Sequence, residues 1–308
     1  MYKLRLVPKE TKIQFMRFHK YGLFISICLA FLSFVGYFSI GLNTGIDFRG
    51  GTLFEVRVPV EKSNLSNIRS AFLETNLGEI SIQSFGKPED ILIRVQKQKQ
   101  DSDLTEQSII KEIKSILRNK VSNNVEFRRV ETVGPVVSGE LKRKGFIALS
   151  LALFAMLIYI WFRFEWQFSI GAIVALIHDV SLTIGFLVIT KLEFNLATIA
   201  AILTIIGYSM NDTVVVYDRI RENLRKYKKM ALLDLLNLSV NNTLSRTTMT
   251  SLTTILALSA LAIFGGANIL GFTLVMIWGV LIGTYSSIFI AGPLLIYFGV
   301  KRNAEVNK

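Results

Sequence analysis

The sequence places an aspartate, Asp212, inside a long apolar stretch, 194–217. A carboxylate at the centre of a membrane helix costs about 2.5–3.5 kcal/mol on insertion scales, so such residues are rare and typically functional. Two neighbours, Asn211 and Thr213, have side chains that can donate hydrogen bonds to it. Asp212 is therefore the first candidate for a functional site, and it needs a partner or a proton.

Arg246 is the candidate partner, because it begins the fifth apolar stretch and two consecutive spans run antiparallel. One interpretation is a static ion pair that joins two helices. The other is a proton-exchange site. Burial favours a neutral carboxyl group and a nearby arginine favours the charged one, so moving Arg246 would take up or release a proton. Arginine cannot itself deprotonate, so it would act as the movable counter-charge.

A second polar pair, His178 and Asp179, lies near the middle of the third apolar stretch. Adjacent helical residues point about 100° apart, so the two cannot face one partner squarely. The pair is either a proton relay or a polar contact between helices. An enzymatic alternative makes Asp179 and Asp212 the carboxylate pair of an intramembrane aspartyl protease. Such proteases carry Tyr-Asp and Gly-x-Gly-Asp, whereas this chain has His-Asp and Asn-Asp.

Membrane helices must position these residues, and the composition indicates that the chain contains such helices. Of the 308 residues, 51% are hydrophobic. A bilayer core of about 30 Å requires about 20 apolar residues per helix. Six stretches are predicted to cross: 21–40, 145–162, 168–190, 194–217, 248–264 and 269–298. The first is too long for a signal peptide and has no cleavage site, so we expect a polytopic α-helical membrane protein.

The net charge of +12 follows the membrane topology rather than a nucleic-acid surface. Cationic residues are concentrated in 1–20, in 218–246, and at Lys301, Arg302 and Lys308. The short loops on the opposite side carry only Lys191. This positive-inside pattern predicts a cytoplasmic N-terminus (1–20) and a cytoplasmic tail (299–308). The cations at 142–144 fall on the outer side, but they follow a long domain, for which the rule is weak.

The segment 41–144 is predicted to be a folded periplasmic domain. Its expected elements are a strand at 52–60, a helix at 63–75, strands at 79–85 and 90–96, a helix at 103–120 and a strand at 124–132. The order β-α-β-β-α-β predicts a ferredoxin-like α+β fold. The chain has one cysteine, Cys28, so no intrachain disulfide can support this domain.

Between the fourth and fifth spans, 218–246 is expected on the cytoplasmic side, with an amphipathic helix at 230–244 along the membrane surface. The residues 218–223 are interpreted as a solvated helix end with local ion pairs. Gly207 is expected to allow a close helix approach. No metal-ligand spacing and no Ser-His-Asp set appear in the sequence.

A glycine-rich segment, 45–52, contains Asp47, Gly50 and Gly51. It has the first two glycines of a phosphate loop, but Gly51 stands where the phosphate-binding lysine would be. We expect instead a tight exit from the first span into the first strand, where glycines permit unusual backbone angles.

Together these motifs resemble the SecF family, the smaller membrane subunit of the bacterial SecDF complex, over nearly the whole chain. The residues that carry the resemblance are Asp47, Gly50 and Gly51 in 45–52, Gly134 and Pro135 in 133–141, His178 and Asp179, Gly207, Asn211 and Asp212 in 207–223, and Arg246 with the threonine-rich run after it. Met210 stands where we expect a small aliphatic residue.

The resemblance implies a member of the resistance-nodulation-division superfamily in the bacterial inner membrane. Such a chain pairs with SecD to form twelve spans, and joins the SecYEG channel, often with YajC and YidC. It uses the proton motive force to promote late-stage export and release of unfolded preproteins. It is not an enzyme and has no cofactor besides the proton, and Asp212, Arg246 and Asn211 belong to the proton pathway. A small-molecule exporter of the same superfamily is the third candidate, although one compact outer domain argues against it.

Overall fold

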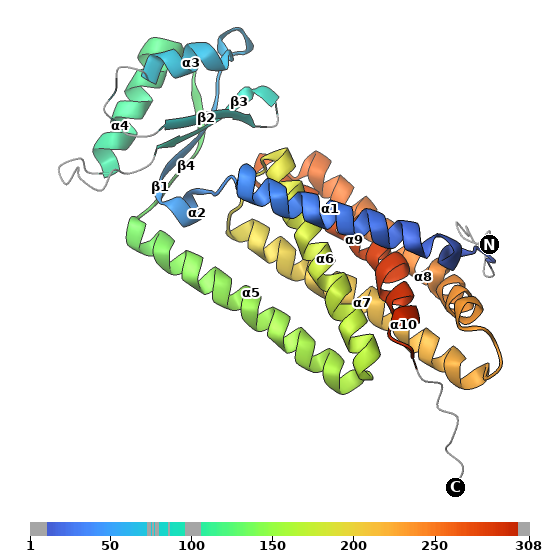
Figure 1. Cartoon of the computed structure of the whole chain (residues 1–308). Coiled ribbons are helices and arrows are strands. Elements are labelled where there is room, and N and C mark those ends of the chain that lie inside the picture. Colours follow the sequence, from blue (N-terminus) through green and yellow to red (C-terminus); the bar gives the residue numbers. More distant parts are fainter. Residues whose placement is uncertain are drawn as a thin grey trace. The chain divides into compact units, whose positions relative to one another are not determined.

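The computed structural model describes residues 11–72, 75, 77, 80–85, 87–95 and 106–300. The chain divides into two compact units, one of residues 1–43 and 148–308 and the other of residues 44–147. The first is entirely helical, and the second holds a small sheet covered by helices (Figure 1).

Among the described residues, six helices are long and apolar enough to cross a membrane, as the sequence predicts. They are α1 (His19–Ser39), α5 (Pro135–Arg163), α6 (Trp166–Thr190), α7 (Leu196–Lys226), α8 (Leu232–Phe264) and α9 (Ala267–Ser286), the last continuing through a π-helical turn (Ser287–Ala291) into α10 (Gly292–Tyr297). The spans containing α6, α7 and α9 bury more than half of their most apolar residues, whereas the other three bury few. These three helices are therefore the centre of the helical unit, and the others expose apolar side chains suited to lipid.

The helix α8 differs from the expectation. The segment 230–244 does not form a separate helix along a membrane surface, because Leu232–Phe264 is one continuous helix of 33 residues. Its amphipathic face is real, but it packs against the chain itself. Asn237 accepts a hydrogen bond from the backbone N–H of Met16 at 2.9 Å, and Asn241 exchanges two bonds with the backbone of Ile13 at 2.9 and 2.8 Å. Binding this N-terminal segment accounts for the polar residues in the pattern.

The π-helical turn after α9 has a cause in the sequence. Pro293 has no N–H to donate to the carbonyl four residues earlier, so the regular bonding pattern cannot continue through it. The buried hydroxyl of Tyr217 donates to the carbonyl of Ala291 at 3.0 Å. Gly171 makes room for that hydroxyl, since a Cβ there would lie 2.4 Å from it.

The second unit is a ferredoxin-like domain, as predicted. Its elements are β1 (Gly51–Arg57), α3 (Leu65–Phe72), β2 (Ile80–Phe85), β3 (Lys87–Val95), α4 (Glu106–Ile116) and β4 (Glu126–Val133). The sheet order is β2-β3-β1-β4, and every pairing is antiparallel. The apolar sides of α3 and α4 pack on one face of the sheet around Phe54, Ile93 and Ile113 (Figure 1). Parts of four predicted elements, at 73–74, 79, 96 and 103–105, lie outside the described residues.

The glycine-rich segment forms the expected tight connection. Asp47 lies in a one-turn helix, α2 (Ile46–Arg49), and Gly50 and Gly51 follow with φ of 74° and 112°. Residues with a Cβ rarely adopt such angles, so glycine is required where β1 begins. At the other end of the domain, Gly134 precedes Pro135, the first residue of α5, a position at which the missing N–H of proline has no cost.

A bidentate ion pair links two strands of this domain. Arg57 on β1 donates to both carboxylate oxygens of Asp90 on β3, at 2.7 and 2.8 Å, and Arg128 lies 3.4 Å away. The Arg57 guanidinium holds the pKa of Asp90 below its ordinary value, against the opposing effect of burial. Because the folded pKa is lowered, the pair stabilises the domain above the unfolded pKa of about 3.9, and this stabilisation is lost as the pH falls through the folded pKa.

We therefore expect Asp90→Asn to destabilise the domain by about 1.5–3 kcal/mol at pH 7, the range for hydrogen bonds to charged groups. The difference from the unsubstituted protein should shrink at low pH. Hydrogen exchange of the β1 and β3 amides in the full chain, corrected for intrinsic rates, measures the loss of stability at pH 7 and at low pH. Glu61→Gln, at an exposed carboxylate, is the control, and a pH-independent difference would contradict the prediction.

Candidate functional site: two carboxylates among hydroxyl groups

Two carboxylates lie inside the helical unit, one on each of two central helices. Asp179 on α6 is fully buried, and Asp212 on α7 is 7% exposed. They do not hydrogen-bond to one another among the described residues. The shared-proton pair that an aspartyl protease needs is therefore not formed in this structure.

Asp212 is held by hydroxyl groups from two other helices. Thr247 on α8 donates to one carboxylate oxygen at 2.7 Å. Ser287, at the start of the π-helical turn, donates to the other at 2.5 Å. Each oxygen thus has a donor, and neither donor carries a charge.

Asp179 has a similar environment with one addition. Its Oδ2 accepts from Ser209 on α7 at 2.5 Å and from Ser286 on α9 at 2.7 Å. The Nδ1 atom of His178 lies 2.9 Å from its Oδ1. The other ring nitrogen of His178 is buried and has no hydrogen-bond partner in the described part of the chain.

Consecutive serines connect the two sites. The hydroxyl of Ser286 lies 2.7 Å from Asp179 and 3.1 Å from the carbonyl of Gly283, and that of Ser287 lies 2.5 Å from Asp212 and 2.9 Å from the carbonyl of Thr284. A serine hydroxyl has one proton, so it donates to only one of these acceptors at a time. It can donate to a carboxylate, or accept from a carboxylic acid while donating to the carbonyl. The site therefore satisfies either protonation state without moving a helix.

Arg246 is not part of this cluster. Its side chain is exposed, and it forms no ion pair within 4 Å with any described carboxylate. The static Asp212–Arg246 ion pair is therefore absent, although Arg246 immediately precedes the Thr247 that binds Asp212. Asn211 also points outward and is exposed, so of the three predicted proton-pathway residues only Asp212 lies inside.

The prediction for Gly207 is wrong within this chain, because a Cβ there would meet nothing within 4 Å. Close helix approach occurs instead at Gly279 and Gly283 of α9. A Cβ at Gly279 would lie 2.2 Å from the Ile205 side chain, and one at Gly283 would lie 2.9 Å from Cβ and 3.2 Å from Cα of Ser209. Gly279 and Gly283 form a GxxxG pattern, typical of close packing in membranes.

Sequence reasoning did not identify Ser209, Ser286 or Ser287 as site residues. Thr247 belongs to the threonine-rich run that follows Arg246. The available signal was the GxxxG pattern three residues before a Ser-Ser pair in an apolar span. That combination indicates a close approach between two helices, together with polar groups that can form hydrogen bonds across it.

Comparisons with known proteins identify the family to which this chain belongs. The family model described as "Protein export membrane protein SecD/SecF, C-terminal" matches residues 112–301, and "SecD/SecF GG Motif" matches residues 38–58. The curated "Protein translocase subunit SecF" of Rickettsia bellii is 46% identical over 302 residues, 98% of each chain. That of Rickettsia felis is 44% identical over 311 residues, covering 100% of this chain and 98% of the relative. The chain belongs to the SecF family.

Solved structures agree with this family assignment. The crystal structure of SecDF, a translocon-associated membrane protein from Thermus thermophilus, matches with a TM-score of 0.82 and 34% identity over 96% of this chain. A SecDF structure in a super-membrane-facing form matches with a TM-score of 0.70 and 33% identity. This SecF-family chain spans 40% of the length of each of those chains. The six-helix membrane fold with an inserted α+β domain is thus that of SecDF.

The close approach of α9 to α7 gives a direct test. Gly283→Ala should lower the stability of the solubilised chain by about 1–3 kcal/mol, the range for overpacking, because the new methyl group meets Cβ and Cα of Ser209, which cannot move without the α7 backbone. Thermal unfolding followed by tryptophan fluorescence measures the effect. Gly271→Ala on the same helix meets open space and should be neutral or stabilising by up to about 1 kcal/mol. Equal melting temperatures for the two variants would refute the close approach.

Proposed function

We propose that this chain is the SecF subunit of the bacterial Sec protein translocase, a multi-pass inner-membrane protein that pairs with SecD. It uses the proton motive force to promote late-stage export and release of unfolded preproteins, and is not itself an enzyme. The curated relatives named as translocase subunits and the SecDF structures support the role in export. Association with the SecYEG channel, and with YajC and YidC, follows from the family resemblance. The proton is the only coupling ion that the proposal requires.

The observation that carries the proton role is the hydroxyl lining of Asp212. An arginine partner would favour only the charged carboxylate, whereas Thr247 and Ser287 suit both protonation states. Arg246 sits one residue from Thr247 with its charge outside the cluster. A rotation of α8 that exchanged these two neighbours would bring the charge of Arg246 next to Asp212 and release its proton.

The available energy is sufficient for such a role. A charge that crosses 100 mV gains about 2.3 kcal/mol, so a driving force on the order of 200 mV supplies roughly 4–5 kcal/mol per proton. That biases a two-state equilibrium by about a thousandfold. One proton can thus favour one conformation of an outer domain strongly, but does not unfold a stable substrate in a single step.

Pairing with SecD is supported by the outward face of α7 and α8. The face exposes Thr204, Asn211, Arg246 and Thr250, and Gly207 leaves open space between the first two. In hydrocarbon such polar residues are costly, and small residues at membrane interfaces allow a second helix to approach. A partner's helices therefore fit this face better than lipid does. The positive-inside pattern supports cytoplasmic termini and an outer α+β domain.

Asp212→Asn tests the proton role. Asparagine keeps the size and can still accept a hydrogen bond from Thr247, but it cannot bind and release a proton. In vesicles that contain the ATP-driven motor, we expect late-stage export by this variant to equal that of the unsubstituted protein treated with a protonophore. Asp234→Asn, at an exposed position in the first turn of α8, should retain full stimulation. Undiminished stimulation in Asp212→Asn would exclude the proposed coupling.

Gly207→Phe tests the partner face. The ring enters space that is open in this chain, so the isolated variant should keep its melting temperature. Co-purification with tagged SecD should fall at least fivefold, whereas Gly207→Ala should have a small effect. Normal recovery of SecD with the phenylalanine variant would place the interface elsewhere.

A further inference from the structure

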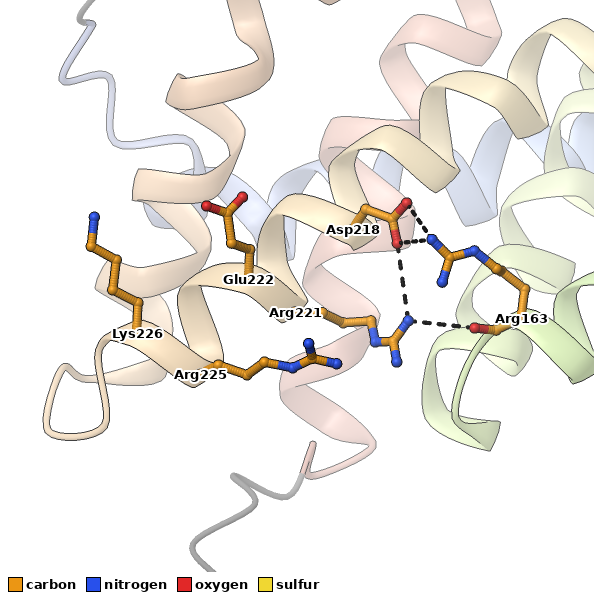
Figure 2. A pocket seen from close by; sticks show the side chains of 6 residues that line it. All are labelled: Arg163, Asp218, Arg221, Glu222, Arg225 and Lys226. Atoms are coloured by element: carbon orange, nitrogen blue, oxygen red, sulfur yellow. Dashed lines mark hydrogen bonds and ion pairs between the residues drawn. The ribbon is translucent and has the colours of Figure 1, made fainter. Parts of the chain in front are cut away.

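A charged pocket lies where the ends of two membrane-spanning helices meet, α5 at Arg163 and α7 at its last two turns (Figure 2). Its volume is about 500 Å³. Its lining residues are Arg163, Asp218, Arg221, Glu222, Arg225 and Lys226. Four cations and two carboxylates thus give the lining a net charge of +2.

Both carboxylates already have strong partners. Asp218 accepts two hydrogen bonds from Arg163, at 2.9 and 2.8 Å. Glu222 accepts one from Arg219, which is outside the pocket lining, at 2.6 Å. The remaining cations of the pocket are therefore not neutralised by these two acids.

Three cations have little or no ionic compensation, although Arg221 lies over the ring of Phe164 at 5.4 Å and Lys226 over that of Tyr227 at 5.2 Å. Arg225 and Lys226 form no ion pair within 4 Å in the described ranges of the chain. Arg221 only approaches Asp218, at 4.0 Å, and makes a long bond of 3.4 Å to the carbonyl of Arg163. Figure 2 shows Arg221 and Arg225 extending in the same direction from successive turns of α7. Like charges at this i, i+4 spacing repel, unless an anion lies between them.

The helix dipole explains only part of this arrangement. Cations in the last turn of α7 interact favourably with the partial negative charge there, which is about half an elementary charge. The same partial charge opposes an anion, but it is smaller than the net +2 of the lining. The dipole also gives no reason for three cations to line a common cavity.

The exposed aromatic residues where α5 and α6 meet favour a lipid as the source of the anion. Trp161, Phe162 and Trp166 at the junction of α5 and α6 are 66%, 86% and 52% exposed. Tryptophan at the ends of spans lies at the level of lipid headgroups. The pocket therefore offers guanidinium groups, which bind phosphate oxygens in pairs. Arg163 in its lining directly follows two exposed aromatic residues of α5, which suit acyl chains.

We propose that this pocket binds the phosphodiester headgroup of an anionic phospholipid. Arg221 and Arg225 hold the phosphate oxygens, Lys226 adds a third charge, and Arg163 remains paired with Asp218. Basic clusters next to membrane helices are suited to anionic headgroups in this way. The site is distinct from the buried carboxylates and does not depend on proton coupling.

Native mass spectrometry of the full chain, released from vesicles of phosphatidylethanolamine and phosphatidylglycerol, tests the proposal. Arg225→Gln/Lys226→Gln should retain at least tenfold less phosphatidylglycerol than the unsubstituted protein. Lys228→Gln/Lys229→Gln removes the same charge from residues that do not line the pocket, and should stay within twofold. The swap Arg225→Lys/Lys226→Arg keeps the charge and should retain the lipid, which controls for misfolding.

Equal loss in both glutamine variants would mean non-specific charge attraction and would overturn the site. Glycerol 3-phosphate added to the lipid-free protein in detergent gives the second arm. We expect no saturable binding at millimolar concentration. Saturable binding that disappears in Arg225→Gln/Lys226→Gln would assign the pocket to a soluble phosphate compound and overturn the lipid assignment.

Discussion

Neutral hydroxyl groups satisfy two carboxylates inside a helical unit built to cross a membrane, and the arrangement of the central helices follows from that requirement. Adjacent residues on a helix point about 100° apart. Ser286 and Ser287 can therefore serve Asp179 on α6 and Asp212 on α7 only if α9 lies between those helices. Gly283 permits that position, since a Cβ there would collide with α7 at Ser209. The glycines of α9 therefore allow the close approach that brings Ser286 and Ser287 to the two carboxylates.

The end of the span that contains α9 shows what holds Ser286 and Ser287 in position. Pro293 interrupts regular helical bonding, and the chain passes through a π-helical turn that begins at Ser287. Such turns are often found at functional sites. Tyr217 donates to the Ala291 carbonyl in this turn, and Gly171 leaves space for its hydroxyl. Helices α6 and α7 therefore hold the turn as well as the carboxylates.

The sequence was sufficient for the fold class and for the identity of the buried acids. Long apolar stretches predict six spans, alternating patterns predict the ferredoxin-like domain, and the high cost of a carboxylate singles out Asp179 and Asp212. The partners of the acids were harder to predict. Serine carries little cost in a membrane helix, so Ser286 and Ser287 give no comparable signal. The choice between Arg246 and Thr247 depends on how α8 is rotated, and because these two neighbours are both polar, the hydrophobic pattern does not specify which of them faces Asp212.

The rotation of α7 connects the two surfaces that matter most for the proposed function. Ser209 and Asp212 point into the bundle, whereas Gly207 and Asn211, on adjacent turns, point out toward the partner face. A rigid helix cannot turn one side without moving the other. If protonation of Asp212 changes the preferred rotation of α7 or α8, that change reaches the partner face directly, with no further element in between. The mismatch between an inward carboxylate and an outward arginine is therefore what the proposed coupling requires, whereas a permanent ion pair would leave the helices with only one stable arrangement.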